Sequence, residues 1–246
     1  MKIMAWNCNM ALRKKLHKIT EYSPDILIIS ECEESLTSNS SLLDSYPNNC
    51  WIGDNKSKGL GIFMKSHLNF ELFEEYNGSF KYILPLKIKD LPNLILFGIW
   101  AMDDKKDKRN GYISQVGSAL NYYRELLKDK ECILIGDFNS NAIWDNFSPK
   151  KYYNHTYVTE YLIQNDIKSV YHEINNQSFG NELEPTFYMY RHEDKGYHID
   201  YAFCSDSLLR ELIGFSIGDY GEWGTYSDHM PLFIEFNEGV CDISTR

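Results

Sequence analysis

Polar residues that could do chemistry follow an apolar run in the second half of the chain. Cys132–Ile135 is continuously apolar, the run stops at Gly136, and Asp137 and Asn139 then stand two residues apart. Such a run is typical of a strand buried on both faces, and residues i and i+2 at a strand end point to the same side. We therefore expect a carboxylate and an amide to project together, a pair that suits a phosphate, a metal ion or an attacking water. An ordinary strand end followed by an Asx turn is the alternative.

Four further strand-like segments end in, or carry, polar residues of the same kinds. They are Asn7 and Asn9 at the end of Lys2–Asn9, Glu31 after Ile26–Ser30, His198 and Asp200 on one face of Tyr197–Cys204, and Asp228 with His229 before Leu232–Phe236. Taken singly, Glu31 also fits a solvated acidic loop, and His198 fits a strand histidine satisfied by a neighbour. Five such segments in one chain instead predict that strand ends converge on one pocket.

The predicted pocket holds carboxylates, amides and imidazoles, and no cysteine. Hard oxygen ligands favour Mg²⁺ or Mn²⁺ over zinc. A divalent cation also reconciles carboxylates that would otherwise repel one another. This combination is the chemistry of phosphoester hydrolysis, with a metal as Lewis acid, a carboxylate that activates water, and an imidazole and an amide that hold the phosphoryl oxygens.

The elements that must position these residues follow an approximately two-fold order, a rhythm of strand, helix and several strands, and then helix and strand. Apolar spacing predicts helices over Ala11–Tyr22, Tyr112–Leu127 and Thr156–Asn165, and a strand over Pro185–Arg191, whereas Lys168–His172 is expected to begin a loop. This rhythm suggests two layers of sheet flanked by helices. No linker, repeat or low-complexity segment divides the chain, so one domain over residues 1–246 is expected.

Composition limits the classes of function. The formal net charge of −10 and the pI of about 5.2 do not suit a protein that coats nucleic acid with a broad basic surface, but they do not exclude a nuclease whose site binds a divalent cation. The six cysteines lack Cys-x-x-Cys spacing, which disfavours a thiolate zinc site. The sequence shows neither an export signal nor a long apolar run. We therefore expect a cytoplasmic protein with no membrane contact, and nothing implies a protein partner.

The sequence resembles the endonuclease/exonuclease/phosphatase superfamily over essentially its whole length. The resemblance is carried by five motifs in order, which are Trp6-Asn7-Cys8-Asn9, Pro24-Asp25-Ile26-Leu27 running to Ser30-Glu31, Gly136-Asp137-Phe138-Asn139, His198-Ile199-Asp200-Tyr201 and Ser227-Asp228-His229-Met230-Pro231. Members include abasic-site endonucleases, pancreatic-type deoxyribonucleases, bacterial sphingomyelinases and inositol polyphosphate 5-phosphatases. The resemblance implies an α/β (α+β) four-layer sandwich, in which two mixed β-sheets pack face to face with helices on the outside.

The resemblance also implies roles at the matching positions. Glu31 looks like the principal metal ligand, Asn7 assists it, and Asp228 sits by the metal. Asp137 looks like the residue that activates water, Asn139 like a phosphate holder, and His229 like the imidazole on the phosphoryl oxygen, oriented and charged by Asp200. Asn9, Trp100 and His198 are candidates for substrate binding. Abasic-site endonucleases carry an aspartate where this chain has Asn9 and a tyrosine near Trp100, which weakens that specific assignment.

Three functional hypotheses remain open. The first is a Mg²⁺- or Mn²⁺-dependent phosphodiesterase whose substrate is nucleic acid. The second is a phosphomonoesterase or small-molecule phosphodiesterase, which the acidic pI favours. The third is a catalytically silent binding module on the same fold, and the six intact residues that the resemblance places at the site argue against it (Glu31, Asp137, Asn139, Asp200, Asp228 and His229).

Overall fold

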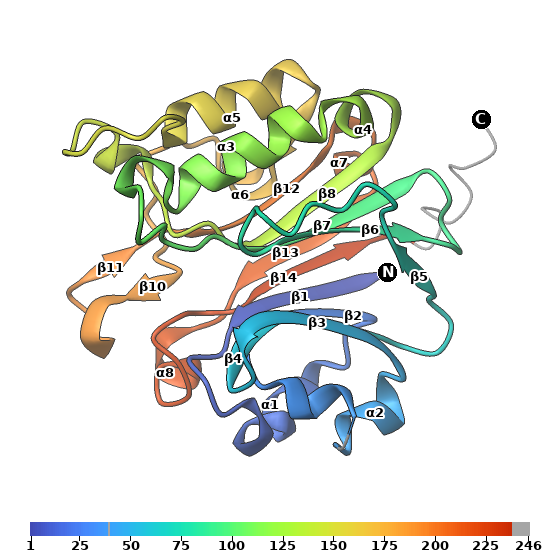
Figure 1. The fold of residues 1–246 in the computed structure, drawn as a ribbon. Helices are drawn as coiled ribbons and strands as arrows, with labels where there is room; N and C mark the ends of the chain where they lie inside the picture. The colour runs from blue at the N-terminus through green and yellow to red at the C-terminus, as the bar shows by residue number, and fades with distance from the viewer. Residues whose placement is uncertain (39, 238–246) are drawn as a thin grey trace.

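Two six-stranded mixed sheets pack face to face in the computed structural model, which describes residues 1–38 and 40–237 (Figure 1). The first sheet contains, in spatial order, β13 (Leu212–Ile217), β14 (Leu232–Phe236), β1 (Lys2–Asn7), β2 (Ile26–Cys32), β4 (Lys58–Met64) and β3 (Asn48–Asn55). Its one parallel pair is β1 with β2, so their carboxyl ends meet at the same edge of the sheet.

The second sheet has the order β5 (Phe70–Leu72), β6 (Ile83–Ile88), β7 (Leu94–Trp100), β8 (Glu131–Asp137), β12 (Asp200–Ser205) and β9 (Ile167–Ser169). Here β7 and β8 are the parallel pair. A short hairpin, β10 (Phe187–Tyr188) and β11 (Gly196–Tyr197), belongs to neither sheet, and its Phe187 forms a β-bridge with His229. The predicted pair of mixed sheets is thereby confirmed.

The apolar runs form strands because they are buried on both faces. In β1, Ile3 and Ala5 face the core between the sheets, whereas Met4 and Trp6 face the helices outside. In β8, Ile133 and Ile135 face the inter-sheet core, while Cys132 and Leu134 pack under helices. Burying alternate residues on opposite faces leaves no polar position in the strand interior, which explains the continuous apolar runs.

Helices cover the outer faces of both sheets (Figure 1). On the first sheet lie α1 (Leu16–Tyr22) and α2 (Leu42–Ser45), with the short 3₁₀ turns η1 (Leu12–Lys14) and η2 (Glu34–Thr37). On the second lie α3 (Ile113–Tyr122) and α5 (His155–Gln164). The remaining helices are α4 (Arg124–Asp129), α6 (Val170–Asn175), α7 (Asp206–Leu209), α8 (Tyr220–Trp223), η3 (Lys108–Asn110), η4 (Ala142–Trp144) and η5 (Met189–Arg191). The four layers match the fold that the sequence motifs implied.

Four local expectations need correction. The single helix over Ala11–Tyr22 is the 3₁₀ turn η1 followed by α1, which begins only at Leu16, because Ala11 has a left-handed φ of 52°. The single helix over Tyr112–Leu127 is two helices, because the helical conformation is interrupted at Tyr123, whose buried ring packs on Phe97. The expected loop at Lys168–His172 instead forms β9 and the start of α6, since residues 167–169 pair with β12, a tertiary contact that local sequence does not show. The strand over Pro185–Arg191 is confined to two residues, because Tyr190 and Arg191 have left-handed φ values of 56° and 58°.

The five cysteines among the described residues are free thiols, and Cys241 lies outside the described residues. Within residues 1–38 and 40–237, no helix is long and apolar enough to cross a membrane.

Candidate active site

The end of β8 lies between two neighbouring strands, and this places Asp137. Its Cα pairs with Trp100 in parallel β7 and with Asp200 in antiparallel β12. The preceding Gly136 has a φ of +140°, and a Cβ there would lie 2.0 Å from the carbonyl oxygen of Ile99. Only glycine avoids this clash, so the Gly-Asp sequence reflects how closely β7 approaches the strand end.

Hydrogen bonds fix both oxygens of the Asp137 carboxylate. Oδ1 accepts the backbone N–H of Asn139 at 2.8 Å, and Oδ2 accepts the Asn139 Nδ2 at 2.9 Å and the Asn7 Nδ2 at 3.0 Å. Asn139 adopts a left-handed φ of 48°, which asparagine tolerates better than most residues. The backbone bond from Asn139 to Oδ1 is that of an Asx turn, the alternative that the sequence offered, and the Asn139 side chain also orients the carboxylate directly.

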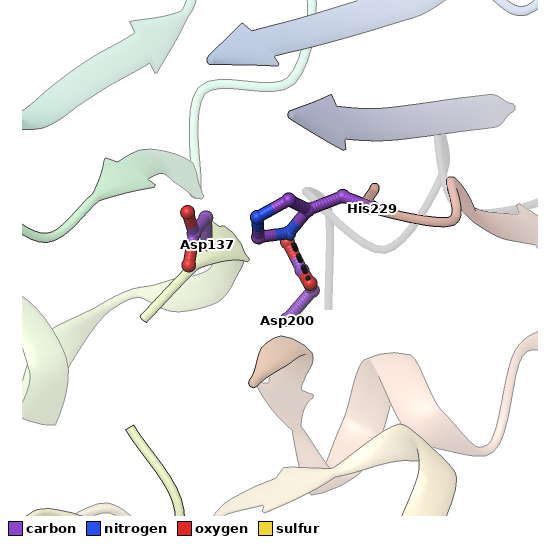
Figure 2. Close-up of side chains that lie close together, drawn as sticks. All are labelled: Asp137, Asp200 and His229. Atoms are coloured by element: carbon purple, nitrogen blue, oxygen red, sulfur yellow. Dashed lines mark hydrogen bonds and ion pairs between the residues drawn. The ribbon is translucent and has the colours of Figure 1, made fainter. Parts of the chain in front are cut away.

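Asp200 and His229 form a buried ion pair beside Asp137 (Figure 2). The His229 Nδ1 lies 2.9 Å from the Asp200 Oδ2, and both side chains are less than a tenth exposed. Thr186 Oγ1 accepts the backbone N–H of Asp200 at 2.9 Å, and Ser227 Oγ accepts that of His229 at 3.0 Å. The backbone on each side of the ion pair is thus held by a buried hydroxyl.

Charge and burial shift the proton affinities of this group. Burial, followed by the charge of Asp200, raises the pKa of Asp137 to about 7. Burial opposes the charged form of His229, but the carboxylates of Asp200 and Asp137 raise the pKa of His229 to about 9. Near neutral pH the site therefore holds an imidazolium next to a carboxyl group that is poised to gain or lose a proton.

Asn7, from the other sheet, bridges the group. Its Oδ1 accepts the backbone N–H of Asn9 at 3.1 Å, which fixes the amide so that Nδ2 is the donor. That Nδ2 lies 3.0 Å from the Asp137 Oδ2, 3.4 Å from the His229 Nε2 and 3.5 Å from the Glu31 Oε1. One amide therefore contacts three of the predicted site residues, and the ends of the two sheets do converge.

Glu31 reaches Asn7 from a distorted position near the end of β2. It has a left-handed φ of 63°, and the pairing of β2 with β4 shifts register between Ser30 and Cys32. Such a conformation costs of order 1–3 kcal/mol and persists only when its surroundings hold it. The Glu31 Oε1 also lies 2.9 Å from the ammonium group of Lys58. The bulge thus points the carboxylate toward Asn7, next to a fixed cation.

Asp228 joins the same network through Asn9. The Asn9 Nδ2 donates to the Asp228 Oδ1 at 2.8 Å, and Asn9 in turn orients Asn7 through its backbone. Asn9 therefore acts within the described structure as a link between predicted metal ligands.

Two candidates for substrate binding, His198 and Trp100, are buried in aromatic contacts. The His198 ring is 3% exposed and packs against Tyr171 and Tyr201, and its Nδ1 donates to the carbonyl of Glu184 at 2.7 Å. The expectation that His198 and Asp200 share a face is not met, because the Asp200 side chain instead meets His229. The Trp100 ring is 2% exposed and stacks on Tyr82, with the Lys58 ammonium 5.4 Å from its centroid.

Sequence reasoning missed three residues that support the site. Lys58 pairs with Glu31, whereas Thr186 and Ser227 hold the backbone of Asp200 and His229. Ser227 was visible as part of the Ser-Asp-His motif, although without a role. Nothing in the local sequence marks Lys58 or Thr186, because their contacts join residues 27 and 14 positions apart.

Among the described residues, one cluster of side chains could hold a hard cation. The ligand atoms of Asp137, Asp200 and His229 lie within 4.8 Å of one another. A histidine ligand must be neutral, so a cation bound by this cluster would compete with the proton that the raised pKa of His229 favours. Glu31, which already holds the ammonium of Lys58, offers a carboxylate without that conflict.

Comparisons with known proteins bear on the fold. Among solved structures, the chain is similar to an AP endonuclease from Archaeoglobus fulgidus, with a TM-score of 0.71, 18% identity, and coverage of 96% of this chain and 99% of that one. It is similar at 18% identity to a 3′-5′ exonuclease (NExo) from Neisseria meningitidis, with a TM-score of 0.68 and coverage of 96% and 100%. A structure described as the 3′ phosphatase NExo from Neisseria bound to product DNA hairpin matches at 18% identity, a TM-score of 0.67 and coverage of 96% and 99%.

No curated protein matches the sequence significantly. The model of the Endonuclease/Exonuclease/phosphatase family matches residues 4–229, which include every predicted site residue. The chain therefore belongs to the endonuclease/exonuclease/phosphatase family of phosphoesterases.

Proposed function

We propose that this chain is a divalent-metal-dependent phosphoesterase that hydrolyses a phosphodiester in nucleic acid. The observation that carries the proposal is the convergence of Asp137 and the Asp200–His229 pair on the Asn7 amide, from two different sheets. A carboxylate poised near neutral pH beside a fixed imidazolium matches water activation next to a phosphoryl group that carries negative charge.

Glu31, with Asn7 and Asp228, would hold the metal, proposed as Mg²⁺ or Mn²⁺. When bound, the ion would supply Lewis-acid polarisation of a phosphoryl oxygen. Glu31 and Asp228 present carboxylate oxygens, the ligand type that these cations prefer. Asn7 turns its Nδ2 toward Glu31, because its Oδ1 accepts the backbone N–H of Asn9, and would assist by holding the Glu31 carboxylate. The ion would take over the charge neutralisation of Glu31 that Lys58 provides in this structure.

Asp137 would accept a proton from the attacking water while the new oxygen–phosphorus bond forms. Asn7 and Asn139 hold the carboxylate so that it cannot rotate away. The His229 imidazolium would donate its Nε2 proton as a hydrogen bond to a non-bridging oxygen, where negative charge is greatest. The bond to the leaving oxygen breaks, and the leaving group takes a proton from solvent as Asp137 releases its own.

Two observations bear on the substrate. Structural neighbours described as acting on or bound to DNA support nucleic acid. The formal net charge of −10 favours the second candidate, a phosphomonoesterase or small-molecule phosphodiesterase, because an acidic chain does not suit a polyanion that is held by a broad basic surface. A silent binding module is the third candidate and predicts no turnover at all.

The pH dependence of kcat is expected to be bell-shaped. Asp137 must lose its proton to act as a base, so activity should rise as the pH passes its pKa of about 7. His229 must keep its proton, so activity should fall as the pH passes its pKa of about 9. A bound divalent cation moves both limbs to lower pH, since it favours deprotonated neighbours. A flat profile from acid to alkaline pH would contradict these two roles.

Metal removal and Glu31→Gln test the proposed metal ligand. The purified protein is given bis-p-nitrophenyl phosphate, a diester, and p-nitrophenyl phosphate, a monoester, with Mg²⁺, Mn²⁺ or EDTA. We expect diester cleavage that EDTA abolishes. In Glu31→Gln, we expect a loss of roughly 10²-fold or more at a metal concentration that saturates the unmodified protein, because a principal charged ligand is gone. Glu34→Gln, which removes the same charge from a partly exposed position nearby that pairs with Lys56, is the control.

The outcomes separate the candidate functions. Metal-dependent diester cleavage supports a phosphodiesterase, and DNA and RNA oligonucleotides are then compared as substrates. Cleavage of the monoester alone favours a phosphatase. If neither ester is cleaved, calorimetric titration with Mg²⁺ and Mn²⁺ shows whether the chain still binds a metal as a silent module would.

A further inference from the structure

The turn that follows β1 has an unusual backbone. Asn9, Met10 and Ala11 are consecutive and have φ values of 48°, 66° and 52°, all in the left-handed region. Residues with a side chain rarely adopt this region, and almost never three in succession. Such a turn needs external contacts to hold it in place.

Lys15 supplies those contacts. Its ammonium donates to the carbonyl oxygen of Cys8, lies 2.9 Å from that of Met10 and 3.4 Å from that of Asn9. The same group lies 5.8 Å from the centroid of the Trp6 ring. Three carbonyls and an aromatic face therefore surround one monovalent cation, which can donate one hydrogen bond to each carbonyl.

The turn has direct consequences for the site. Its first left-handed residue, Asn9, donates its backbone N–H to the Asn7 Oδ1 and its side chain to the Asp228 Oδ1. The first of these bonds sets the orientation of the Asn7 amide, and hence the contact of Nδ2 with Asp137. If the turn relaxed, Asn7 would lose the contact that fixes its amide.

We propose that Lys15 is a positioning residue whose ammonium acts as a built-in monovalent cation, and that the carbonyls of Cys8, Asn9 and Met10 form a cage that would accept K⁺ or NH₄⁺ if the side chain were shortened. The effect on catalysis rests on the proposed function, whereas the cation cage does not. Glu33 holds the following residues independently, since it accepts the backbone N–H of Leu12 and pairs with Arg13.

Thermal melting tests the cage without any assay of activity. Lys15→Ala opens space for an ion, whereas Lys15→Met fills the same space with a side chain that donates no hydrogen bond. Each variant is melted in KCl, NH₄Cl and tetramethylammonium chloride at equal ionic strength. Lys14→Ala, a change of the exposed neighbouring lysine, is the matched control.

We expect Lys15→Ala to melt lower than the unmodified protein in tetramethylammonium chloride and to recover at least half of that loss in KCl or NH₄Cl. Lys15→Met should melt lower than the unmodified protein in all three salts. The melting temperatures of the unmodified protein and of Lys14→Ala should not depend on which of the three salts is present. If Lys15→Ala responds to the three salts as the unmodified protein does, the cage is refuted.

Kinetics test the positioning role. In tetramethylammonium chloride, at a temperature where every variant is folded, kcat of Lys15→Ala for the diester should fall roughly tenfold to a hundredfold, the scale expected for a misplaced catalytic group. KM should change less, and K⁺ should restore kcat. An unchanged kcat in a folded Lys15→Met would overturn positioning. If the unmodified protein cleaves no phosphoester, the proposed function fails, while melting still decides the cage.

Discussion

Replacing Asp137 with asparagine is expected to lower kcat for the diester by about 10²–10⁴-fold, the range that a positioned general base contributes. The amide is nearly isosteric with the carboxylate but cannot accept a proton from water near neutral pH. KM should change much less than kcat, because the proposed metal ligands and His229, which would contact the substrate, are unchanged. Steady-state kinetics with bis-p-nitrophenyl phosphate measure both quantities.

The fold of this variant should persist, because two effects on stability oppose one another. The pKa of Asp137 is raised in the folded state, so above pH 7 the folded protein must carry a buried charge, and removing that charge is stabilising. The new amide, however, places a donor opposite the Nδ2 of Asn7 or Asn139. We expect the melting temperature at pH 8 to stay within about 4 °C of the unmodified value, which corresponds to roughly 1 kcal/mol for a chain of this size.

Asp44→Asn makes the same chemical change at an exposed position and should leave kcat unaltered. Retained turnover in a folded Asp137→Asn protein would show that another group activates the water, and the role given to Asp137 would then be wrong.

Much of the candidate site could be predicted because its residues lie where buried strands end. The apolar run before Gly136 predicted the strand that carries Asp137, and the strand before Glu31 was equally clear. In these cases the local pattern and the final position agree, because a strand buried on both faces can expose polar groups only at its ends. Asp137 and Asn139 also act together, but through an Asx turn rather than strand alternation, since β8 ends at Asp137 and Asn139 has a left-handed φ of 48°.

The contacts between the two sheets could not be predicted in the same way. Asn7 and Asp137 are 130 residues apart, and no local signal indicates that the Asn7 amide would orient the Asp137 carboxylate. Lys58 and Lys15 belong to ordinary lysine-containing segments, and only the folded chain places one on Glu31 and the other on the carbonyls after β1.

The period-two alternation of a strand also gave one wrong prediction about which residues share a face. It placed His198 and Asp200 on one face, but regular pairing of β12 begins only at Asp200. His198 lies before the strand, and its ring turns into an aromatic cluster with Tyr171 and Tyr201. A prediction of shared faces holds only where both residues belong to the paired part of a strand.

His229→Gln is the change with the second largest expected effect, a loss of about 10²–10³-fold in kcat, the scale for removal of one donor that stabilises a developing negative charge. Glutamine can still donate a neutral hydrogen bond but carries no charge. The alkaline limb of the pH profile, which we assign to loss of the His229 proton, should disappear in this variant.

Two companion variants decide whether the assignment is correct. Asp200→Asn removes the carboxylate that contributes most to raising the pKa of His229, so the alkaline limb should move to lower pH while remaining visible. His198→Asn keeps a donor at the position of Nδ1 for the Glu184 carbonyl and lies outside the proposed site, so both limbs should stay in place. If the alkaline limb survives in His229→Gln, or moves in His198→Asn and not in Asp200→Asn, then the imidazolium of His229 is not the group that must stay protonated. The Asp200–His229 pair would then serve to hold the ends of β12 and β14 together rather than to stabilise the reacting phosphate.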